Sequence, residues 1–514
     1  MNGAKSLVET LIAGGIEVCF ANPGTSEMHL VAALDGQKQI RCVLGLFEGV
    51  VTAAADGYAR MVGKPACTLL HLGPGLANGL ANLHNAKRAH VAIVNLIGQH
   101  ATFHLAKDTP LNSDIEAIAG PYANWLRTSR SVSELGRDAA EALVASRTPP
   151  GQIATLIVPA NVAWEVGGQI ATIPRVPTAP LPPPENIEHA AVMLRSGLRT
   201  AILLSGSALY GRGLETAGRI AAATNAKLLV PYPFPRLERG AGRPPVDRVP
   251  YVPQQAIELL KEFRQLILVG SAEPLAYFAS PGRNSVLTAP DCYIHTLTTP
   301  EEDCAGALGA LLANWNLPLS QVLIEKISRP PLPSGEITPD GIAAAIASLL
   351  PENAIVVDES MTSGRGIMSA ARFAPPHDWL GNTGGSIGIA LPLAVGAAVA
   401  CNTRPVLCLS ADGSGMYTLQ ALWTMAREGL NITTVIFANR AYSVLKREFS
   451  NLGIGEPGTK ASSLFDIGHP DLDWVSLAKG MGIPATRVIS LDEFSRALRT
   501  SFESSGPMLV EVPL

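Results

Sequence analysis

Two polar segments that directly follow apolar runs have the residue types of a metal and phosphate site. Asp412 and Gly413 come after the run 407–411, and Asn439 comes after the run 433–437. We expect both runs to be buried parallel strands, whose carboxyl ends meet at one edge of a sheet. Mg²⁺ prefers oxygen ligands, carboxylates among them, and glycine lets backbone N–H groups approach a phosphate closely. The pattern therefore predicts a site for a magnesium ion and a phosphate where the two segments meet.

Two further candidates, Glu48 and His71, lie in the first third of the chain. Glu48 follows the apolar run 42–46 and opens a helical pattern, whereas His71 follows the run 66–70. An acid among apolar residues is costly unless it has a partner, which favours a functional role. However, an acid in the first turn of a helix is stabilised by the helix dipole, and a histidine at a strand end is more often structural. From the residue types alone, both explanations stay open.

These candidates would be positioned by three segments in which short β-branched runs alternate with helical patterns. Such alternation indicates mostly parallel sheets flanked by helices. Two proline-rich stretches, 174–184 and 330–339, interrupt it, because proline cannot continue a helix or a central strand. We therefore predict an α/β protein of three consecutive domains, at 1–172, 185–328 and 336–514.

The composition of the chain restricts its function class. Its 514 residues are 47% hydrophobic and 16% charged, and the net charge of −4 offers no basic field for nucleic acid. The longest apolar run, 387–401, is short and contains a proline, which argues against a membrane span. The N-terminus begins an amphipathic helix and not a signal peptide. Seven cysteines, an odd number, suggest reduced thiols, so we expect a cytoplasmic protein.

The segments around Asp412 and Asn439 resemble the thiamine-diphosphate motif, Gly-Asp-Gly and a later Asn-Asn, of pyruvate decarboxylase, benzoylformate decarboxylase and acetolactate synthase. Ala411 and Ala438 replace the first Gly and the first Asn of the motif, but neither lost group is the one that binds the metal. The resemblance implies that the side chains of Asp412 and Asn439 and the backbone carbonyl of Ala441 hold Mg²⁺.

Segments elsewhere extend the resemblance to nearly the whole chain. Residues 46–50 are similar to the signature of the pyrimidine-binding domain, in which the acid at Glu48 bonds N1′ of the coenzyme. The turn 22–25 and His71 are similar to active-site segments of benzoylformate decarboxylase, with Thr25 in place of a serine. No histidine occurs in the region 277–282, where that enzyme has a second one, so we do not expect a mechanism with two histidines.

Two segments of the last third complete the resemblance. The turn 358–363 is similar to one that touches the diphosphate, and the loop 384–388 places Ile387 where the family has a bulky aliphatic residue between the two rings of the coenzyme. The carbonyl of Gly385 would accept from the 4′-amino group. The coenzyme-binding residues implied by the resemblance are Asn22, Glu48, Thr362, Gly385, Ile387, Asp412, Gly413, Ser414, Asn439 and Tyr442. The implied catalytic residues are Glu48, His71 and Thr25, and those of the substrate pocket are Gln99, Val444 and Glu448.

The resemblance implies a thiamine-diphosphate- and Mg²⁺-dependent decarboxylase of a 2-oxo acid, with carboligation as a further reaction. An acetolactate synthase-like carboligase and a non-catalytic cofactor-binding paralogue remain alternatives, and a NAD-dependent oxidoreductase is a more distant one. The turn 206–211 matches a dinucleotide-binding turn weakly, so FAD is not expected, although relatives that bind it leave it open. The family pattern also implies a homodimer or a dimer-based tetramer, with sites at the interface that combine Glu48 and Asp412 of different subunits.

Overall fold

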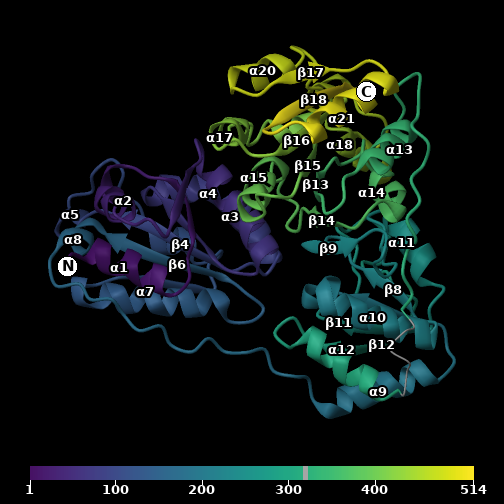
Figure 1. The fold of residues 1–514 in the computed structure, drawn as a ribbon, viewed down its shortest axis with the longest axis horizontal. Coiled ribbons are helices and arrows are strands. Elements are labelled where there is room, and N and C mark those ends of the chain that lie inside the picture. The colour runs from purple at the N-terminus through teal and green to yellow at the C-terminus, as the bar shows by residue number, and fades with distance from the viewer. Residues whose placement is uncertain (316–321) are drawn as a thin grey trace.

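The computed structural model describes residues 1–315 and 322–514, which form three sheets flanked by helices (Figure 1). The sheets succeed one another along the chain, apart from one strand described below. No helix of the described residues is long and apolar enough to cross a membrane. The predicted fold class is confirmed.

The first sheet is parallel throughout and has the strand order β2-β1-β3-β4-β6-β5. Its central strands are apolar and buried on both faces, as parallel strands covered by helices must be. The strands are β1 (Val18–Asn22), β2 (Arg41–Leu44), β3 (Ala66–Leu70), β4 (Ile93–Gln99), β5 (Trp125–Thr128) and β6 (Ile153–Pro159). The helices are α1 (Gly3–Ala13), α2 (Met28–Asp35), α3 (Glu48–Val62), α4 (Leu72–Arg88), α5 (Thr102–Leu105), α6 (Ile115–Ala119), α7 (Val132–Arg147) and α8 (Ala160–Trp164).

The second sheet is also parallel, with the order β10-β8-β7-β11-β12. No helix or strand lies between α8 and α9, so the proline-rich stretch there runs as a linker. The strands are β7 (Thr200–Leu204), β8 (Lys227–Val230), β10 (Asp247–Arg248), β11 (Gln265–Val269) and β12 (Tyr293–Thr298). The helices are α9 (Pro184–Arg195), α10 (Gly211–Thr224), α11 (Pro253–Leu260) and α12 (Cys304–Ala313).

The third sheet has the order β17-β18-β16-β15-β13-β14-β9. Its last strand, β9 (Arg236–Arg239), comes from the middle of the chain and pairs antiparallel with β14, which local patterning did not predict. The other strands are β13 (Ile355–Glu359), β14 (His377–Gly381), β15 (Val406–Ala411), β16 (Ile432–Ala438), β17 (Ala485–Arg487) and β18 (Met508–Pro513). The helices are α13 (Pro339–Leu349), α14 (Ile367–Ala370), α15 (Ala390–Ala400), α16 (Asp412–Gly415), α17 (Ala421–Arg427), α18 (Ser443–Asn451), α19 (Thr459–Phe465), α20 (Trp474–Gly480) and α21 (Leu491–Glu503).

Helices α3 and α15 join the first and third sheets through a close backbone contact. A Cβ atom on Gly57 would lie 2.1 Å from the carbonyl oxygen of Leu393, so only glycine permits this approach. At the carboxyl end of α3, Arg60 pairs with Asp56 and donates to the carbonyl of Gly381. Glu48, at the other end of α3, lies roughly 18 Å along the helix axis from Arg60. Arg60 therefore lies at the end of β14, and Glu48 lies at the far end of α3.

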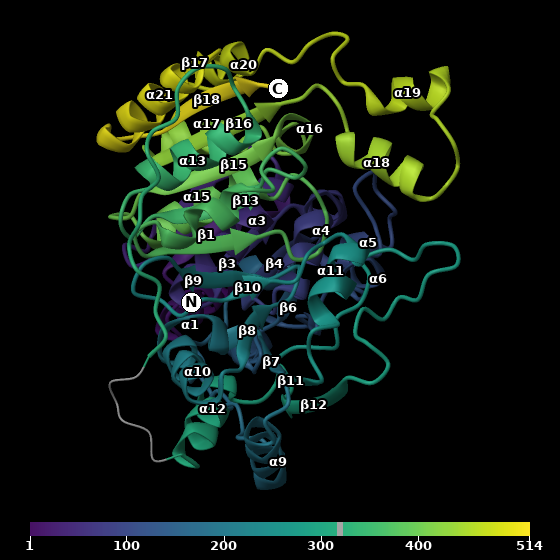
Figure 2. The ribbon, with the colours of Figure 1, turned by 90° about the vertical axis from the view of Figure 1, so that its right-hand side faces the viewer.

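Helices α18 and α19 lie at one side of the molecule, outside the layers of the third sheet (Figure 2). Neither helix contains a buried residue. Two of their apolar side chains are exposed, Leu445 by 44% and Leu464 by 75%. A helix pair with a solvated apolar face is typical of a surface that another polypeptide covers.

Candidate active site

A cavity of about 460 Å³ lies at the carboxyl end of the third sheet, between this sheet and the second. The parallel strands β13, β14, β15 and β16 all end on this side, as the open-sheet rule predicts. Six of the sequence-predicted residues line the cavity: Thr362, Gly385, Ile387, Tyr442, Val444 and Glu448. The second sheet contributes aromatic residues to the opposite wall, chiefly Tyr232, Tyr251 and Tyr277.

Asp412 and Asn439 meet at the ends of β15 and β16, as the sequence predicts. The backbone N–H of Arg440, the residue after Asn439, donates to Oδ2 of Asp412 at 2.7 Å. Asn439 accepts through Oδ1 from the N–H of Ala441 at 3.0 Å and donates through Nδ2 to Ser363. Both side chains are thereby held at the edge of the sheet. Ser363 belongs to the turn 358–363, which also carries Thr362.

The donor set at Asp412 fits a hard cation such as Mg²⁺. Asp412 is 2% exposed, and burial raises the pKa of its carboxyl, so a bound cation would stabilise the charged form. Among the described residues there is no cluster of three or more His, Cys, Asp or Glu side chains that could hold a metal ion. A cation here would therefore rely on one carboxylate with amide and carbonyl oxygens, which is the ligand chemistry of Mg²⁺ and not that of zinc.

Small residues open the space beside this pair of side chains. A Cβ atom on Gly413 would lie 2.7 Å from the ring of Tyr442, so glycine is needed for the tyrosine to pack there. Ser414 is 3% exposed and lies in the short helix α16, directly after Gly413. The N–H groups and the hydroxyl at the start of this turn are the types of donor that bind a phosphate.

The loop between β14 and α15, which carries Gly385 and Ile387, is anchored by Glu359, a residue to which the sequence reasoning gave no role. Glu359 is 2% exposed and accepts from the N–H groups of Gly388 at 3.1 Å and Ala390 at 3.1 Å. Nδ2 of Asn382 donates to the same carboxyl at 3.1 Å. Burial raises the pKa of Glu359 to about 7. The only signal in the sequence was an acid at a strand end ahead of a glycine-rich loop.

A second group of polar residues lies at the carboxyl edge of the first sheet and is called the acid cluster below: Glu27, Glu48, His71 and Asn78. Nδ2 of Asn78 donates to Oε2 of Glu48 at 2.9 Å, and Glu48 is 8% exposed. A Cβ atom on Gly75 would lie 3.0 Å from Oε1 of Glu48, which explains a glycine in the first turn of α4. Glu48 therefore has a fixed position and one oxygen free for another partner.

Glu27 was not predicted to be functional, yet it orients His71. Nδ1 of His71 lies 2.7 Å from Oε2 of Glu27, and the N–H of Gly24 donates to the same oxygen at 2.8 Å. Glu27 is fully buried, whereas the side chain of His71 is 21% exposed. A Cβ atom on Gly24 would overlap the His71 ring. This carboxylate holds the imidazole so that Nε2 is free to exchange a proton.

The remaining candidates of the first sheet lie at the same edge with different partners. Thr25 is exposed at the start of the turn after β1, and Asn22 donates to the carbonyl of Gly45 at 2.8 Å. Gln99 is 8% exposed at the end of β4 and accepts from the N–H of His100. None of the residues that line the 460 Å³ cavity belongs to the first sheet or its helices. Within one chain, the acid cluster and the cavity are therefore separate.

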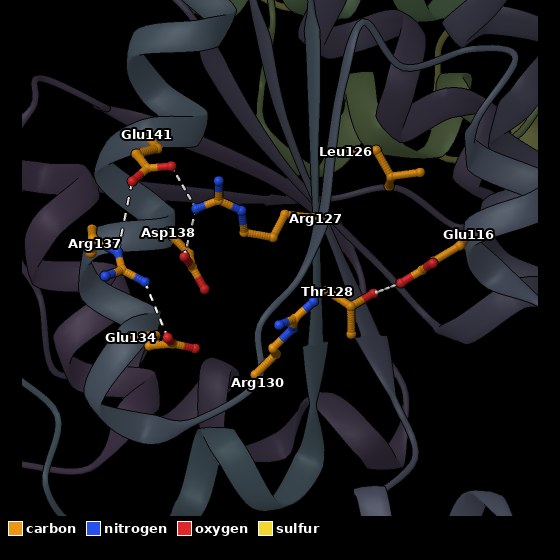
Figure 3. Close-up of a pocket in the computed structure, with 9 residues that line it drawn as sticks. All are labelled: Glu116, Leu126, Arg127, Thr128, Arg130, Glu134, Arg137, Asp138 and Glu141. Carbon is orange, nitrogen blue, oxygen red and sulfur yellow. Dashed lines mark hydrogen bonds and ion pairs between the residues drawn. The ribbon is translucent and has the colours of Figure 1, made fainter.

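A second hollow, of about 850 Å³, lies beside β5 at the edge of the first sheet (Figure 3). Arg127 points between Asp138 and Glu141 and pairs with both, at 2.8 and 2.5 Å. Arg137 pairs with Glu134 at 3.2 Å. Charges that neutralise one another in this way leave little attraction for a charged ligand, so the 460 Å³ cavity is the better candidate site.

Comparisons with known proteins show what the whole chain is similar to. Residues 1–118 match the N-terminal TPP binding domain of thiamine pyrophosphate enzymes, and residues 363–512 match the C-terminal TPP binding domain. A Mycobacterium tuberculosis protein named "Putative acetolactate synthase large subunit IlvX" is 49% identical over 100% of this chain and 99% of its own length. Benzoylformate decarboxylase of Pseudomonas aeruginosa is 27% identical over 98% of this chain and 97% of its own. The structure of a Rhodococcus jostii thiamine diphosphate-dependent 4-hydroxybenzoylformate decarboxylase matches the fold with a TM-score of 0.87 at 21% identity, covering 100% of this chain and 99% of that one.

Proposed function

The chain belongs to the thiamine pyrophosphate enzymes, and on this premise we propose that it decarboxylates a 2-oxo acid with thiamine diphosphate and Mg²⁺. The observation that carries the proposal is the meeting of Asp412 and Asn439 beside a cavity that Gly385 and Ile387 also line. A carboxylate and an amide are suited to a magnesium ion that tethers a diphosphate.

Residues of the third sheet would hold the coenzyme. Asp412, Asn439 and the carbonyl of Ala441 would hold the magnesium ion, and Ser414 and Thr362 would donate to the diphosphate. Ile387 would support the rings of the coenzyme, and the carbonyl of Gly385 would accept from its amino group. When bound, thiamine diphosphate supplies a carbanion centre and an electron sink for the cleavage of the bond to the carboxylate. The chain itself contributes binding, orientation and proton transfer.

The acid cluster would handle protons in this scheme. Glu48, held by Asn78, would bind N1′ of the pyrimidine and hold a proton at its carboxyl there. His71, held by Glu27, would exchange a proton with the substrate through Nε2, and Thr25 and Gln99 lie at the same edge of the first sheet. A base that a buried carboxylate orients is pre-organised for transfer, because its geometry does not have to be set during the reaction.

We propose that each active site is shared by two chains, which form a homodimer or a dimer-based tetramer. In one chain the acid cluster lies outside the cavity, so a second copy is needed to bring them together. Apolar side chains are exposed near both halves, with Leu46 45% and Phe103 70% exposed near the first and Ile454 62% exposed near the second. A two-fold arrangement would cover both surfaces at once. Sedimentation of a monomer at micromolar concentration would contradict this assembly.

The reaction is tested with a panel of 2-oxo acids in the presence of thiamine diphosphate and Mg²⁺. We expect CO₂ and an aldehyde in equal amounts from at least one acid. The second candidate is a carboligase, which the name of the 49% identical relative favours. Acetolactate formed from pyruvate, with less aldehyde than CO₂, would establish that alternative. A panel in which no acid yields CO₂ would contradict both reactions and favour a non-catalytic paralogue.

Replacing Glu359 by alanine is expected to weaken coenzyme binding about 10-fold or more, because three buried donors of the loop lose their acceptor. Glu359→Gln keeps one acceptor oxygen and should lose less of the coenzyme affinity.

A pH dependence follows from the same residue. Since burial raises the pKa of Glu359 to about 7, its carboxyl gains charge, and accepts more strongly, as the pH rises through this value. Coenzyme affinity should therefore rise from about pH 6 to about pH 8 more in the parent than in Glu359→Gln. A fluorescence titration with thiamine diphosphate measures both; equal pH profiles would refute the anchoring role.

We further propose that the middle sheet binds no FAD. The N–H of Gly211, the first residue of α10, donates to Oε2 of Glu238 at 3.1 Å. A carboxylate thus occupies the helix N-terminus where a dinucleotide would place its pyrophosphate. We expect the purified protein to show no flavin absorbance and FAD titration to leave its fluorescence unchanged. A yellow protein with stoichiometric flavin would overturn this prediction.

We propose a cytoplasmic location on the state of the thiols. All seven cysteines are unpaired. Burial raises the pKa of Cys408 well above its usual value, so this thiol stays protonated and inert. Unpaired cysteines are typical of proteins from reducing compartments.

A further inference from the structure

The wall of the cavity contributed by the second sheet is mostly aromatic and includes three phenols beside Pro233 and Arg248. The ring of Tyr277 lies 5.7 Å from that of Tyr251 and 6.2 Å from that of Tyr232, and Phe278 extends the group. None of the residues that line the cavity is a histidine. On this side of the cavity, phenols are therefore the hydroxyl groups available to a substrate.

Tyr277 is the phenol that reaches the loop of the third sheet. A Cβ atom on Gly385 would lie 2.0 Å from Oη of Tyr277, so the phenol occupies the space that the missing side chain leaves. Gly385 has φ +79°, a conformation that favours glycine for a second reason. The proposed function gives the carbonyl of Gly385 to the amino group of the coenzyme. Oη of Tyr277 thus lies next to the peptide that would position the reacting end of the coenzyme.

The state of the phenol suits a proton donor. Desolvation raises the pKa of Tyr277, and the positive charge of Arg88 opposes this only in part. The hydroxyl is therefore protonated at neutral pH. No hydrogen bond to another described residue engages Oη of Tyr277, so its proton is not committed to the protein.

We propose that Tyr277 is a catalytic residue of the cavity, which hydrogen-bonds the substrate through Oη and protonates the carbon that loses CO₂. This inference rests on the proposed decarboxylation. When the bond to the carboxylate breaks, its electron pair stays on the former carbonyl carbon and CO₂ leaves. That carbon takes the proton of Tyr277, and the phenolate takes one proton from water. The net reaction consumes one proton for each 2-oxo acid converted into aldehyde and CO₂.

The test compares Tyr277→Phe, which removes only the hydroxyl, with the matched control Tyr293→Phe. Tyr293 lies on β12, is 52% exposed and stacks on His189, away from the cavity. We expect Tyr277→Phe to lower kcat about 100-fold or more, the size of a lost general acid. Its affinity for an acylphosphonate, which resembles the substrate but cannot release CO₂, should fall by about 2- to 10-fold, the size of one hydrogen bond. Thiamine diphosphate affinity should stay within about 2-fold, and Tyr293→Phe should match the parent throughout.

Three outcomes would overturn the role of Tyr277. The first is a kcat of Tyr277→Phe within about 3-fold of the parent, which is too small for a lost general acid. The second is an unchanged acylphosphonate affinity. The third is a parallel loss of thiamine diphosphate affinity or of the circular dichroism of the parent, which would show a structural role. Tyr277→His supplies another proton donor and should recover at least about a tenth of the parent kcat. If the parent decarboxylates no 2-oxo acid, the proposed function fails, whereas the acylphosphonate comparison still reports on Tyr277.

Discussion

Glu48→Gln is expected to lower turnover by at least about 100-fold while leaving the affinity for thiamine diphosphate within a few-fold of the parent. Glutamine has the size of glutamate and can still accept from Asn78, so the helix start and the Gly75 turn stay intact. It cannot hold a proton for N1′, and the proton transfer that depends on it is lost. Turnover is measured with the best acid of the panel, and affinity by fluorescence titration.

A matched control for this variant is Glu17→Gln, in the same part of the chain. The side chain of Glu17 is 54% exposed and pairs with Lys64 at 2.8 Å on the surface. Removing its charge should leave both turnover and coenzyme affinity unchanged. A Glu48→Gln enzyme that works within a few-fold of the parent would show that Glu48 is only a first-turn acid of α3.

Asp412→Ala is expected to abolish detectable coenzyme binding, a loss of at least about 100-fold, because it removes the proposed metal ligand together with the acceptor of two backbone N–H groups. Asp412→Asn keeps an acceptor oxygen but loses the charge, and should bind about 10-fold or more weakly. Calorimetric titration with thiamine diphosphate and Mg²⁺ measures both variants. Glu503→Gln, an exposed acid on α21, serves as the control.

The outcome of the Asp412 series separates a metal role from a folding role. If Asp412→Ala is as well folded as the parent and binds the coenzyme equally well, the cation is held elsewhere. If the Mg²⁺ concentration needed for coenzyme binding falls in the order Asp412→Ala, Asp412→Asn, parent, the carboxylate is the ligand. Because β15 and β16 are buried along their whole length, a folding defect is a real outcome, which circular dichroism detects.

The third sheet was the part most readily predicted from the sequence. Its apolar runs end in polar residues, and parallel strands bring such ends together, so Asp412 and Asn439 could be placed at one edge from local pattern alone. The apolar run 66–70, which precedes His71, likewise forms a strand with these bounds, β3. Short apolar runs bounded by turn residues and rich in β-branched residues favour buried strands over helices.

Contacts between distant segments could not be predicted in the same way. Glu27 and His71 are 44 residues apart, and the pattern shows only that both follow strands, not that the carboxylate faces the imidazole. Strand β9 pairs with β14 across more than a hundred residues, a register that no local period reveals. The roles of Glu359 and Tyr277 follow from their contacts with the loop around Gly385, and the sequence alone does not show these contacts.

The separation of the acid cluster from the cavity within one chain gives the account its most direct test. Glu48→Gln and Asp412→Ala subunits, each inactive alone, are mixed, dissociated and allowed to reassociate. If sites are shared between chains, a hybrid dimer has one site that carries both lesions and one intact site. Random pairing then predicts recovery of about a quarter of the parent turnover. If Glu48 and Asp412 of the same chain form a site, every site carries a lesion, and the mixture stays as inactive as its components.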